Sequence, residues 1–326
     1  MKNTTQKTAP KYDLLADWML NLYCNFSCPY CFWSTDERLK DKNFLGHENI
    51  DQIVDFFDKS GKTWLIHMSG GEPFIHPRYV ELCKKLTKKH FISINTNLTL
   101  NTVHDFIEEI DPSRVAFLHC ALHYNERVKR HKVDLFVDKY KKLRAAGFNA
   151  YVTQVFNPPV IPLFQKIAKE FQKDKIIIRP KSFRGIYENK QYPQQYSKEE
   201  RALFNKYSLL ADKHEKIGAT HVDPNLDRDF IVGDLTFKGM KCAAGRDFVY
   251  IRFNGDIVRC HASNKVMGNM FEGTLDLAKD AEVCPFVVCP CPYYGLRYTE
   301  GKPKILPHPE VMTGKSVAQA MLYDGN

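Results

Sequence analysis

Residues 24–31 read CNFSCPYC and directly follow the apolar run Trp18–Leu22, which has the length of one buried strand. This loop carries three thiols, with three and then two residues between them. A structural zinc site needs four ligands, and no fourth Cys or His follows within the loop; the nearest, His47, is far along the chain. A catalytic zinc site takes three protein ligands but usually includes His. Three thiolates on one loop instead suit a [4Fe–4S] cluster in which one iron receives no ligand from the protein.

Short apolar runs and amphipathic segments alternate from Leu14 to about Arg179. Residues 50–57 have the helical spacing, with apolar side chains at i, i+3, i+4 and i+7, and end before Gly61. Strands alternating with such helices predict βαβ units and a parallel sheet. The expected fold class is α/β, a partial (β/α)6 barrel like a TIM barrel, with an open doubly wound sheet as the alternative. The runs expected as strands are Trp18–Leu22, Trp64–His67, Phe91–Ile94, Val115–Leu122, Ala150–Val155 and Ile176–Ile178.

Polar motifs also follow the second and third expected strands. Residues 69–73 read SGGEP, and residues 95–97 read NTN. Taken alone, residues 69–73 are equally well interpreted as an ordinary turn between a strand and a helix. In a (β/α) barrel, however, the segments that follow successive strands meet at the face where active sites are built. The three motifs are therefore expected to lie together at that face.

In this order the motifs resemble the radical S-adenosylmethionine (radical SAM) superfamily, and the resemblance spans residues 18 to about 180. It implies a cluster held by Cys24, Cys28 and Cys31 and a cofactor, SAM, that chelates the open iron. It also implies reductive cleavage of SAM to a 5′-deoxyadenosyl radical, with an electron from a flavodoxin- or ferredoxin-like donor. The residues that the resemblance assigns to the cofactor are Tyr30, Ser69, Gly70, Gly71, Glu72, Pro73, Asn95 and Asn97.

Polar side chains at the ends of the later strands are further candidates for the cofactor or the substrate. In the family, such positions line the substrate pocket or hold the SAM carboxylate. Each one, taken singly, is also compatible with an ordinary hydrogen-bonded polar residue. The candidates are His119, His123, Tyr124, Gln154, Asn157, Arg179 and Lys181, of which His123, Gln154 and Arg179 are assigned to the cofactor.

A second group of cysteines lies near the C-terminal end. Two strand-like runs flank Asn254-Gly255, the strongest short signal for a β-hairpin. The spacing Cys242-x12-Gly255-x4-Cys260 resembles the opening of SPASM and twitch domains, the auxiliary domains of one radical SAM subgroup. The resemblance implies one auxiliary [4Fe–4S] cluster, and the alternative is structural zinc. Its ligands would be Cys242, Cys260 and two of Cys284, Cys289 and Cys291.

The rest of the chain divides around these two clusters. Residues 184–198 are rich in Tyr, Gln and Pro and are expected to form a loop, and Ser197 with Glu200 predicts a capping box for the next helix. The expected divisions are a tail over 1–13, the barrel over 14–183, a loop and helical linker over 184–239, a Cys-rich β-hairpin domain over 240–300 and a tail over 301–326.

Composition sets the broad class. The chain has 326 residues, of which 44% are hydrophobic and 26% charged, and its 22 Phe, 16 Tyr and 3 Trp exclude a largely disordered protein. No run approaches the length of a membrane span, and the polar N-terminus lacks a secretory signal, so a cytoplasmic location is expected. The net charge of +9 is scattered, which disfavours nucleic acid as a partner and leaves room for an anionic substrate.

The substrate is predicted from what the chain lacks. Peptide-modifying relatives often carry a long N-terminal peptide-binding region, whereas 23 residues precede Cys24. We therefore expect an oxidoreductase of the SPASM/twitch subgroup that abstracts hydrogen from a small, anionic substrate such as a sugar, cyclitol or nucleotide-linked metabolite, for net oxidation or rearrangement. Two alternatives stay open. One is a maturase for a ribosomally synthesised peptide, and the other is a non-catalytic zinc-binding interaction protein.

Overall fold

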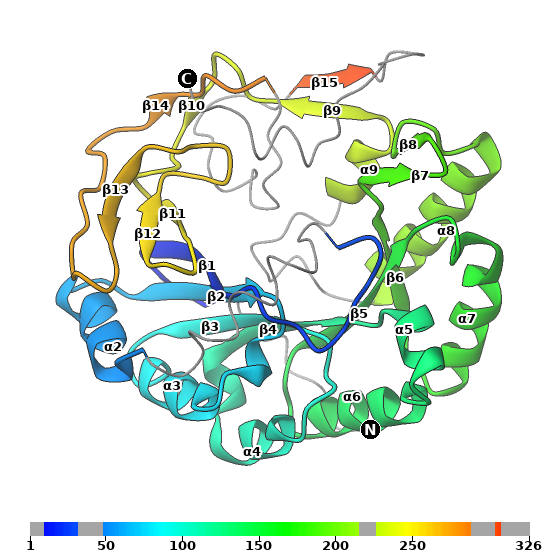
Figure 1. Ribbon diagram of the computed structural model, residues 1–326, viewed down its shortest axis with the longest axis horizontal. Helices are drawn as coiled ribbons and strands as arrows, with labels where there is room; N and C mark the ends of the chain where they lie inside the picture. Colours follow the sequence, from blue (N-terminus) through cyan, green and yellow to red (C-terminus); the bar gives the residue numbers. More distant parts are fainter. Residues whose placement is uncertain (1–9, 32–47, 215–225, 288–303, 308–326) are drawn as a thin grey trace.

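A curved sheet of nine strands forms the centre of the molecule. The computed structural model describes residues 10–31, 48–214, 226–287 and 304–307. The strand order in the sheet is β13-β12-β11-β1-β2-β3-β4-β5-β6, and neighbours from β1 to β6 are parallel. Figure 1 shows that the sheet is curved, with the helices on the outside of the curve. The six parallel strands are β1 (Leu14–Asn21), β2 (Trp64–Gly70), β3 (Phe91–Thr96), β4 (Val115–Ala121), β5 (Ala150–Phe156) and β6 (Ile178–Ser182).

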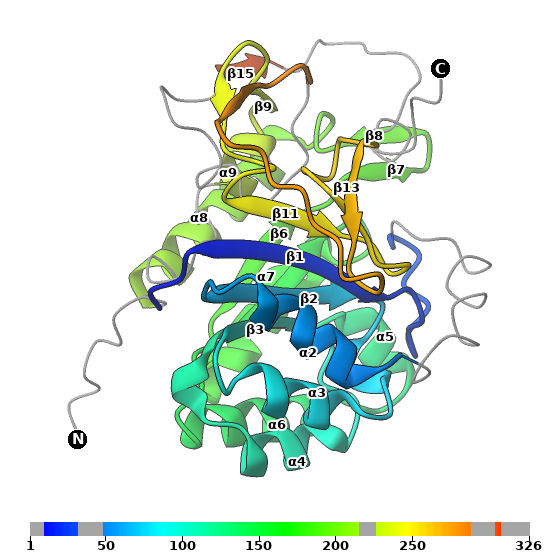
Figure 2. The ribbon, with the colours of Figure 1, turned by 90° about the vertical axis from the view of Figure 1, so that its left-hand side faces the viewer.

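Helices cover the outer face of this sheet (Figures 1 and 2). They are α2 (Ile50–Lys59), α3 (Tyr79–Leu86), α4 (Thr102–Glu109), α5 (Tyr124–Lys129), α6 (Val133–Ala145) and α7 (Ile161–Lys173). Helix α2 begins where the Asn49 side chain accepts hydrogen bonds from two backbone N–H groups of the first turn. Its apolar stripe includes Phe57, which contacts Trp18 and Trp64 of the strands. No helix in the described ranges is long and apolar enough to cross a membrane.

The alternation of side chains along the strands separates two environments. Trp18, Ile66 and Ile94 join the core between the sheet and the helices. The residues between them, such as Asp17 and His67, face the opposite side, the inside of the curve. Because helices α2–α7 lie on one face of the sheet, the partial barrel is confirmed and the doubly wound alternative is wrong.

Several strands extend beyond the predicted apolar runs. Asn95 lies within β3, and Arg179 and Lys181 lie within β6, although the sequence placed these polar residues after the strands. The runs ended too early because polar side chains alternate with apolar ones at the ends of these strands. Those polar side chains are tolerated there because they face the inside of the barrel.

The predicted hairpin at Asn254-Gly255 is confirmed, and it continues the barrel sheet. Strand β11 (Phe248–Ile251) pairs in parallel with β1, so that Leu15 lies opposite Phe248. Strands β12 (Asp256–Val258) and β13 (Val266–Asn269) follow in antiparallel order. Gly255 has φ +86°, and a Cβ there would lie 2.5 Å from the Phe271 ring. The hairpin is thus an extension of the sheet through β1.

The expected linker contains regular structure of its own. The capping box is confirmed, because the Ser197 N–H donates to the Glu200 carboxylate at 2.7 Å and the Glu200 N–H donates to the Ser197 hydroxyl at 3.1 Å. The helices and strands outside the main sheet are β7 (Gly185–Tyr187), β8 (Lys190–Tyr192), α8 (Lys198–His214), α9 (Leu226–Phe230), β9 (Gly233–Thr236), β10 (Lys241–Cys242), β14 (Glu282–Val283) and β15 (Lys304–Pro307). Strand β15, in the expected C-terminal tail, pairs with β9.

Candidate active site

Gly70 and Gly71 hold the segment that leads into the first cysteine. The Gly71 N–H donates to the Asn21 carbonyl at 2.8 Å, and the next N–H, that of Glu72, donates to the Tyr23 carbonyl at 2.9 Å. A Cβ on Gly71 would lie 2.0 Å from the Tyr23 oxygen, and one on Gly70, at φ +124°, 2.1 Å from the Asn21 oxygen. Both glycines are therefore required by contact with residues 21–23. Their predicted contact with SAM stays a prediction.

The Glu72 carboxylate joins the ends of β2 and β3. It is buried and accepts hydrogen bonds from the Thr96 hydroxyl at 2.7 Å, the Asn97 N–H at 2.6 Å and the Phe74 N–H at 3.2 Å. Burial raises the pKa of Glu72 to about 7, although these hydrogen bonds and the Arg127 charge act in the opposite direction. Pro73 begins the short helix that follows (Pro73–Ile75). The predicted SAM-binding segment is thus fixed by its acidic residue.

The loop with the three thiols lies against this segment. The Cys24 sulfur accepts from the Phe26 N–H at 3.4 Å and from the Asn97 side-chain amide at 3.8 Å. The Cys31 N–H donates to the Cys28 carbonyl at 3.1 Å, and none of the three thiols forms a disulfide with a described residue. Burial raises the pKa of Cys24 to about 12, and the nearby Glu72 and the other two thiols act in the same direction. A neutral Cys24 thiol is therefore expected in the absence of bound metal.

The donor set fits an iron–sulfur cluster better than a single metal ion. Within the described ranges, no three His, Cys, Asp or Glu side chains surround one ion position. A [4Fe–4S] cluster does not need that arrangement, because each iron takes its own thiolate and the cluster separates the sulfurs. The N–H groups that point at Cys24 are the donors that a bound thiolate accepts. The ligand role of Cys24, Cys28 and Cys31 stays a prediction with this support.

His123 lies against the thiol loop. Its Nδ1 is 2.8 Å from the Tyr30 hydroxyl and 3.5 Å from the Cys28 sulfur. The ring stacks on Tyr30, with centroids 5.9 Å apart, and meets Phe26 edge to face at 5.8 Å. Burial lowers the pKa of His123 to about 4, and the Arg127 charge acts in the same direction, so the ring is neutral at pH 7. Tyr30 and His123, both predicted from the sequence, are brought together.

Asn95 and Asn97, the predicted ribose contacts, differ in their surroundings. The Asn97 amide donates to the Asn25 side chain at 2.9 Å and accepts from the Thr99 N–H at 3.0 Å. The Asn95 side-chain oxygen is buried and has no hydrogen-bond partner among the described residues. A buried amide oxygen without a partner is costly, and a bound hydroxyl or amine would satisfy it. Asn95 is the better candidate for direct contact with a ligand.

The other predicted cofactor residues have protein partners. The Gln154 oxygen accepts from the Tyr124 N–H at 2.8 Å, and Arg179 donates to the Asp212 carboxylate at 2.7 Å. The Ser69 hydroxyl lies 3.4 Å from the Asp17 carboxylate. These contacts join β5 to the start of α5, β6 to α8 (Lys198–His214), and β2 to β1.

Arg127 was not predicted from the sequence. It is fully buried on α5, and its guanidinium donates to the carbonyls of Asn97 and Leu122. It also lies over the Phe136 ring at 4.3 Å and over the Phe26 ring at 5.4 Å. One buried cation therefore connects the loop after β3 with the thiol loop. The only sequence signal was its place one turn into the helix after the fourth strand.

A belt of polar side chains lines the inside of the barrel. In the strand register, Asp17 lies beside His67, His67 beside Ser93, and His119 beside Tyr151. We call Asp17, His67, Ser93, His119, Thr153 and Lys181 the inner belt. His67 is 2.9 Å from the Ser93 hydroxyl, and His119 is hydrogen-bonded to Thr153. Burial lowers the pKa of His67 to about 4 and that of His119 well below its usual value, so both rings are neutral at pH 7.

The charged groups of the inner belt differ in pairing. The Asp17 carboxylate is 3.0 Å from His261, which comes from the turn after β12 and lies against the Tyr250 ring, with centroids 4.1 Å apart. The Lys181 ammonium makes no hydrogen bond or ion pair with the described part of the chain. Burial lowers the pKa of Lys181, and the charges of Asp227 and Asp17 oppose that effect. Lys181 is therefore a cation inside the barrel without a fixed counter-ion among these residues.

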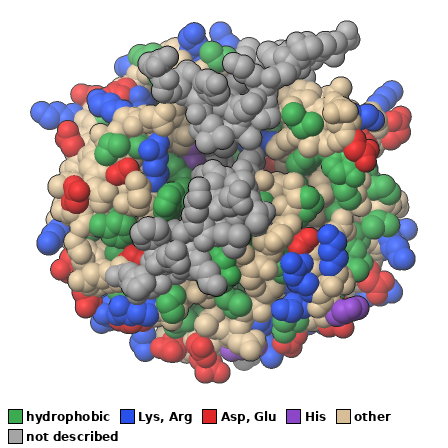
Figure 3. All heavy atoms as spheres, viewed as in Figure 1, with side chains coloured by type: hydrophobic (Ala, Val, Ile, Leu, Met, Phe, Trp, Pro, Cys, Tyr) green, Lys and Arg blue, Asp and Glu red, His purple; other side chains and the backbone are tan. Residues whose placement is uncertain are grey.

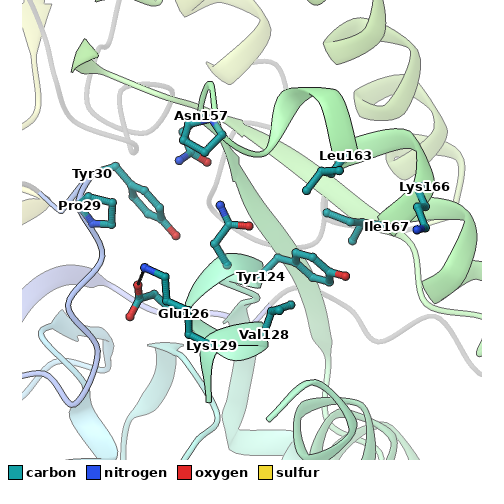
Figure 4. A pocket seen from close by; sticks show the side chains of 12 residues that line it. Pro29, Tyr30, Tyr124, Glu126, Val128, Lys129, Asn157, Leu163, Lys166 and Ile167 are labelled. Atoms are coloured by element: carbon teal, nitrogen blue, oxygen red, sulfur yellow. Dashed lines mark hydrogen bonds and ion pairs between the residues drawn. The ribbon is translucent and has the colours of Figure 1, made fainter. Parts of the chain in front are cut away.

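A separate cavity of about 590 Å³ lies beside the thiol loop. Figure 4 shows Pro29 and Tyr30 on one side and Leu163 on the other, with α5 between them. The Asn157 side-chain oxygen is buried at this cavity and lacks a hydrogen-bond partner among the described residues. The cavity is thus lined in part by Tyr30, the residue that contacts His123. The Asn157 side-chain oxygen could accept a hydrogen bond from a ligand bound there.

Three of the five C-terminal thiols come together. Cys242 and Cys284 are buried in one small cluster, and Cys260 packs against it. The backbone explains the contact, because the Cys284 N–H donates to the Met240 carbonyl at 2.8 Å and Cys242 pairs with Glu282. Cys289 and Cys291 lie outside the described residues.

On the face drawn in Figure 3, the described Lys and Arg side chains are interspersed with Asp and Glu.

Comparisons with known proteins agree with this arrangement. The radical SAM superfamily model matches residues 20–162. A tungsten-containing aldehyde ferredoxin oxidoreductase cofactor-modifying protein of Pyrococcus furiosus is 32% identical over 84 residues, which cover 24% of this chain and 22% of that protein. The chain thus matches about a fifth of that curated relative.

Solved structures share the fold. SuiB of Streptococcus suis superposes with a TM-score of 0.53 at 16% identity, over 80% of this chain and 64% of SuiB. The anSMEcpe structure with bound AdoMet superposes with a TM-score of 0.54 at 13% identity, over 79% of this chain and 78% of the other. At these identities the likeness shows the fold alone. The matched family model identifies residues 20–162 as a radical SAM superfamily domain.

Proposed function

We propose that this chain is a radical SAM oxidoreductase that abstracts hydrogen from a small anionic substrate bound inside the barrel. The inner belt carries this proposal. A half-buried ammonium without a fixed counter-ion among the described residues, together with two neutral imidazoles, favours an anionic or polar ligand over an apolar side chain. Sugars, cyclitols and nucleotide-linked metabolites have the hydroxyl and anionic groups that such a belt binds.

Each part of the site has a separate task in this scheme. Cys24, Cys28 and Cys31 would hold the [4Fe–4S] cluster, and Asn95 would satisfy its buried oxygen by binding SAM. A bound cluster and SAM supply a 5′-deoxyadenosyl radical when one electron arrives from a flavodoxin- or ferredoxin-like protein. The barrel wall excludes water from that radical, and Lys181 pairs with the anionic group and orients the substrate below it. We place the reaction in the cytoplasm.

The C-terminal thiols support an auxiliary cluster of the SPASM/twitch kind. We assign Cys242, Cys260 and Cys284 as ligands, because they share one buried cluster, with the fourth from Cys289 or Cys291. His261 follows Cys260 and contacts Asp17 inside the barrel, so this site adjoins the inner belt. A fully ligated cluster held by these thiols would supply an acceptor for the electron left on the substrate, which would make the net reaction an oxidation.

The experiment is isotope transfer. The reconstituted, reduced protein is incubated with SAM and deuterated pools of sugar phosphates, cyclitols and nucleotide sugars, and deuterium is followed into 5′-deoxyadenosine. We expect label from a small anionic pool. Label that moves only from peptide would overturn the substrate class and leave the superfamily assignment intact.

A peptide substrate is the second candidate. SuiB has been solved with its precursor peptide SuiA, and anSMEcpe with the peptide Cp18Cys. Both share the fold of this chain, which favours including deuterated peptides in the same experiment. A third candidate, a non-catalytic zinc protein, predicts colourless material with stoichiometric zinc and no SAM cleavage.

A further inference from the structure

His123 lies close to a predicted cluster ligand, Cys28. Its Nδ1 lies 3.5 Å from the Cys28 sulfur, within reach of an N–H···S hydrogen bond. The imidazole comes from the loop after β4, whereas Cys28 belongs to the loop after β1. The contact therefore depends on the tertiary fold.

Three contacts hold the ring in this position. Tyr30 stacks on one face, Phe26 meets the ring edge to face, and the Tyr30 hydroxyl lies 2.8 Å from Nδ1. The backbone of His123 has φ +47°, a left-handed conformation in which His, Asn and Asp are enriched. This backbone conformation and the three ring contacts together fix the direction of the imidazole.

The chemistry of a bound thiolate decides which way the proton lies. A thiolate that ligates iron accepts hydrogen bonds and donates none. The Tyr30 hydroxyl is itself hydrogen-bonded to the Cys28 side chain, so it donates to the thiolate and its oxygen accepts from His123. The neutral imidazole then places its proton on Nδ1, which faces both the Tyr30 oxygen at 2.8 Å and the Cys28 sulfur at 3.5 Å. A hydrogen bond to a ligating sulfur withdraws negative charge from the cluster, and reduction adds negative charge. The bond therefore favours the reduced cluster.

We propose that His123 is a positioning residue that donates an N–H···S hydrogen bond to Cys28 and thereby raises the reduction potential of the cluster. The proposal rests on the proposed function only in that Cys28 must ligate a cluster. It makes delivery of the electron easier and does not depend on the identity of the substrate.

The test measures the midpoint potential of the reconstituted protein, without SAM, by titration followed with EPR spectroscopy. His123→Gly removes the donor and fits the left-handed backbone, so we expect a midpoint more negative than that of the unmodified protein. His123→Asn keeps an amide N–H near the position of Nδ1 and also fits this backbone, so it should restore the midpoint. His104→Ala on α4 is the control and should leave it unchanged. Equal midpoints in all four proteins, at equal iron content, overturn the proposal.

A second measurement needs no variant. In unmodified protein labelled with 15N-histidine, pulsed EPR of the reduced cluster should detect coupling to one histidine nitrogen and to one exchangeable proton. His123→Gly should lose both couplings if it binds a cluster. Absence of both couplings from the unmodified protein overturns the role of His123 alone. Absence of any reducible cluster overturns the proposed function as well.

Discussion

The Glu72 carboxylate accepts a 2.6 Å hydrogen bond from the backbone N–H of Asn97, which joins the end of β2 to the end of β3. The same carboxylate accepts from Thr96 and Phe74, and Glu72 itself donates its backbone N–H to Tyr23. One buried acid therefore fixes the relative positions of three loops at the mouth of the barrel. The predicted cluster loop, the predicted SAM segment and the predicted ribose contact all depend on it.

We expect the contribution of Glu72 to the free energy of unfolding to fall as pH rises from about 4.5 to about 7. Burial raises the pKa of Glu72 from 4.5 in the unfolded chain to about 7, so the folded state holds the proton across that window. The contribution is complete below pH 4.5 and is lost above pH 7, with a size of up to about 3 kcal/mol. Urea unfolding at several pH values should show the free energy of unfolding of the unmodified protein falling relative to that of Glu72→Gln across this window, because the buried histidines titrate in both proteins. An equal slope in both would contradict the assignment.

Cys28→Ala should abolish SAM cleavage, because it removes one of three proposed cluster ligands. Cys83→Ala is the matched control, since Cys83 is fully buried in the helix-covered core and is not a proposed cluster ligand. That control should lose about 1 kcal/mol of stability and keep its cleavage. The measurement is 5′-deoxyadenosine formation by the reconstituted, reduced proteins. Retained cleavage in Cys28→Ala refutes the ligand assignment.

Cys260→Ala should keep measurable SAM cleavage and lose most net product. The reason is that the auxiliary site takes the electron after hydrogen abstraction and has no part in cleaving SAM. Cys120→Ala, a buried cysteine of β4, is the control and should affect neither quantity. The ratio of product to 5′-deoxyadenosine is the readout, once the substrate class is known. An unchanged ratio would show that this thiol has no redox role.

Arg127→Met should lower the free energy of unfolding by about 2–4 kcal/mol, because it leaves the buried carbonyls of Asn97 and Leu122 without their donor. Arg130 lies three residues after Arg127 and is partly exposed, so Arg130→Met should lower the free energy of unfolding by less than about 1 kcal/mol. Urea unfolding of the apoprotein measures both values. We also expect weaker SAM binding in Arg127→Met, because the loop after β3 loses its anchor.

Lys181→Met should stop deuterium transfer from the anionic pool while leaving substrate-independent SAM cleavage intact. Lys181→Arg keeps the positive charge and should recover part of the transfer. The control Lys84→Met alters an exposed lysine that pairs with Glu109 and should change neither reaction. Undiminished transfer in Lys181→Met would argue against an anionic group bound at the inner belt.

The barrel was predictable because its signal is local. Each strand is an apolar run that is followed by a segment with helical spacing. Within the strands, the alternation of Asp17 with Trp18 and of Ile66 with His67 distinguishes the face that packs on the helices from the face inside the barrel. The Asn254-Gly255 hairpin was equally visible, since its turn chemistry is confined to two residues. In the same way, residues 24–31 and 69–73 carry their motifs in contiguous sequence.

Long-range contacts explain what the sequence did not reveal. No local pattern indicates that β11 pairs with β1, because their residues lie more than 200 positions apart. The burial of Arg127 depends on carbonyls from two other loops, and the need for Gly71 depends on Tyr23. Lys181 appeared to follow a strand because the apolar run ended early, whereas it faces the barrel interior from within β6.

The pairing of β11 with β1 has a consequence for biosynthesis. The strand that leads into the cysteine loop is made first, but its outer neighbour, residues 248–251, emerges from the ribosome only after three quarters of the chain. Until then β1 is an unprotected sheet edge, and pairing across so long a stretch is slow. We therefore expect iron to be loaded at residues 24–31 only after β11 has paired with β1 and covered that edge.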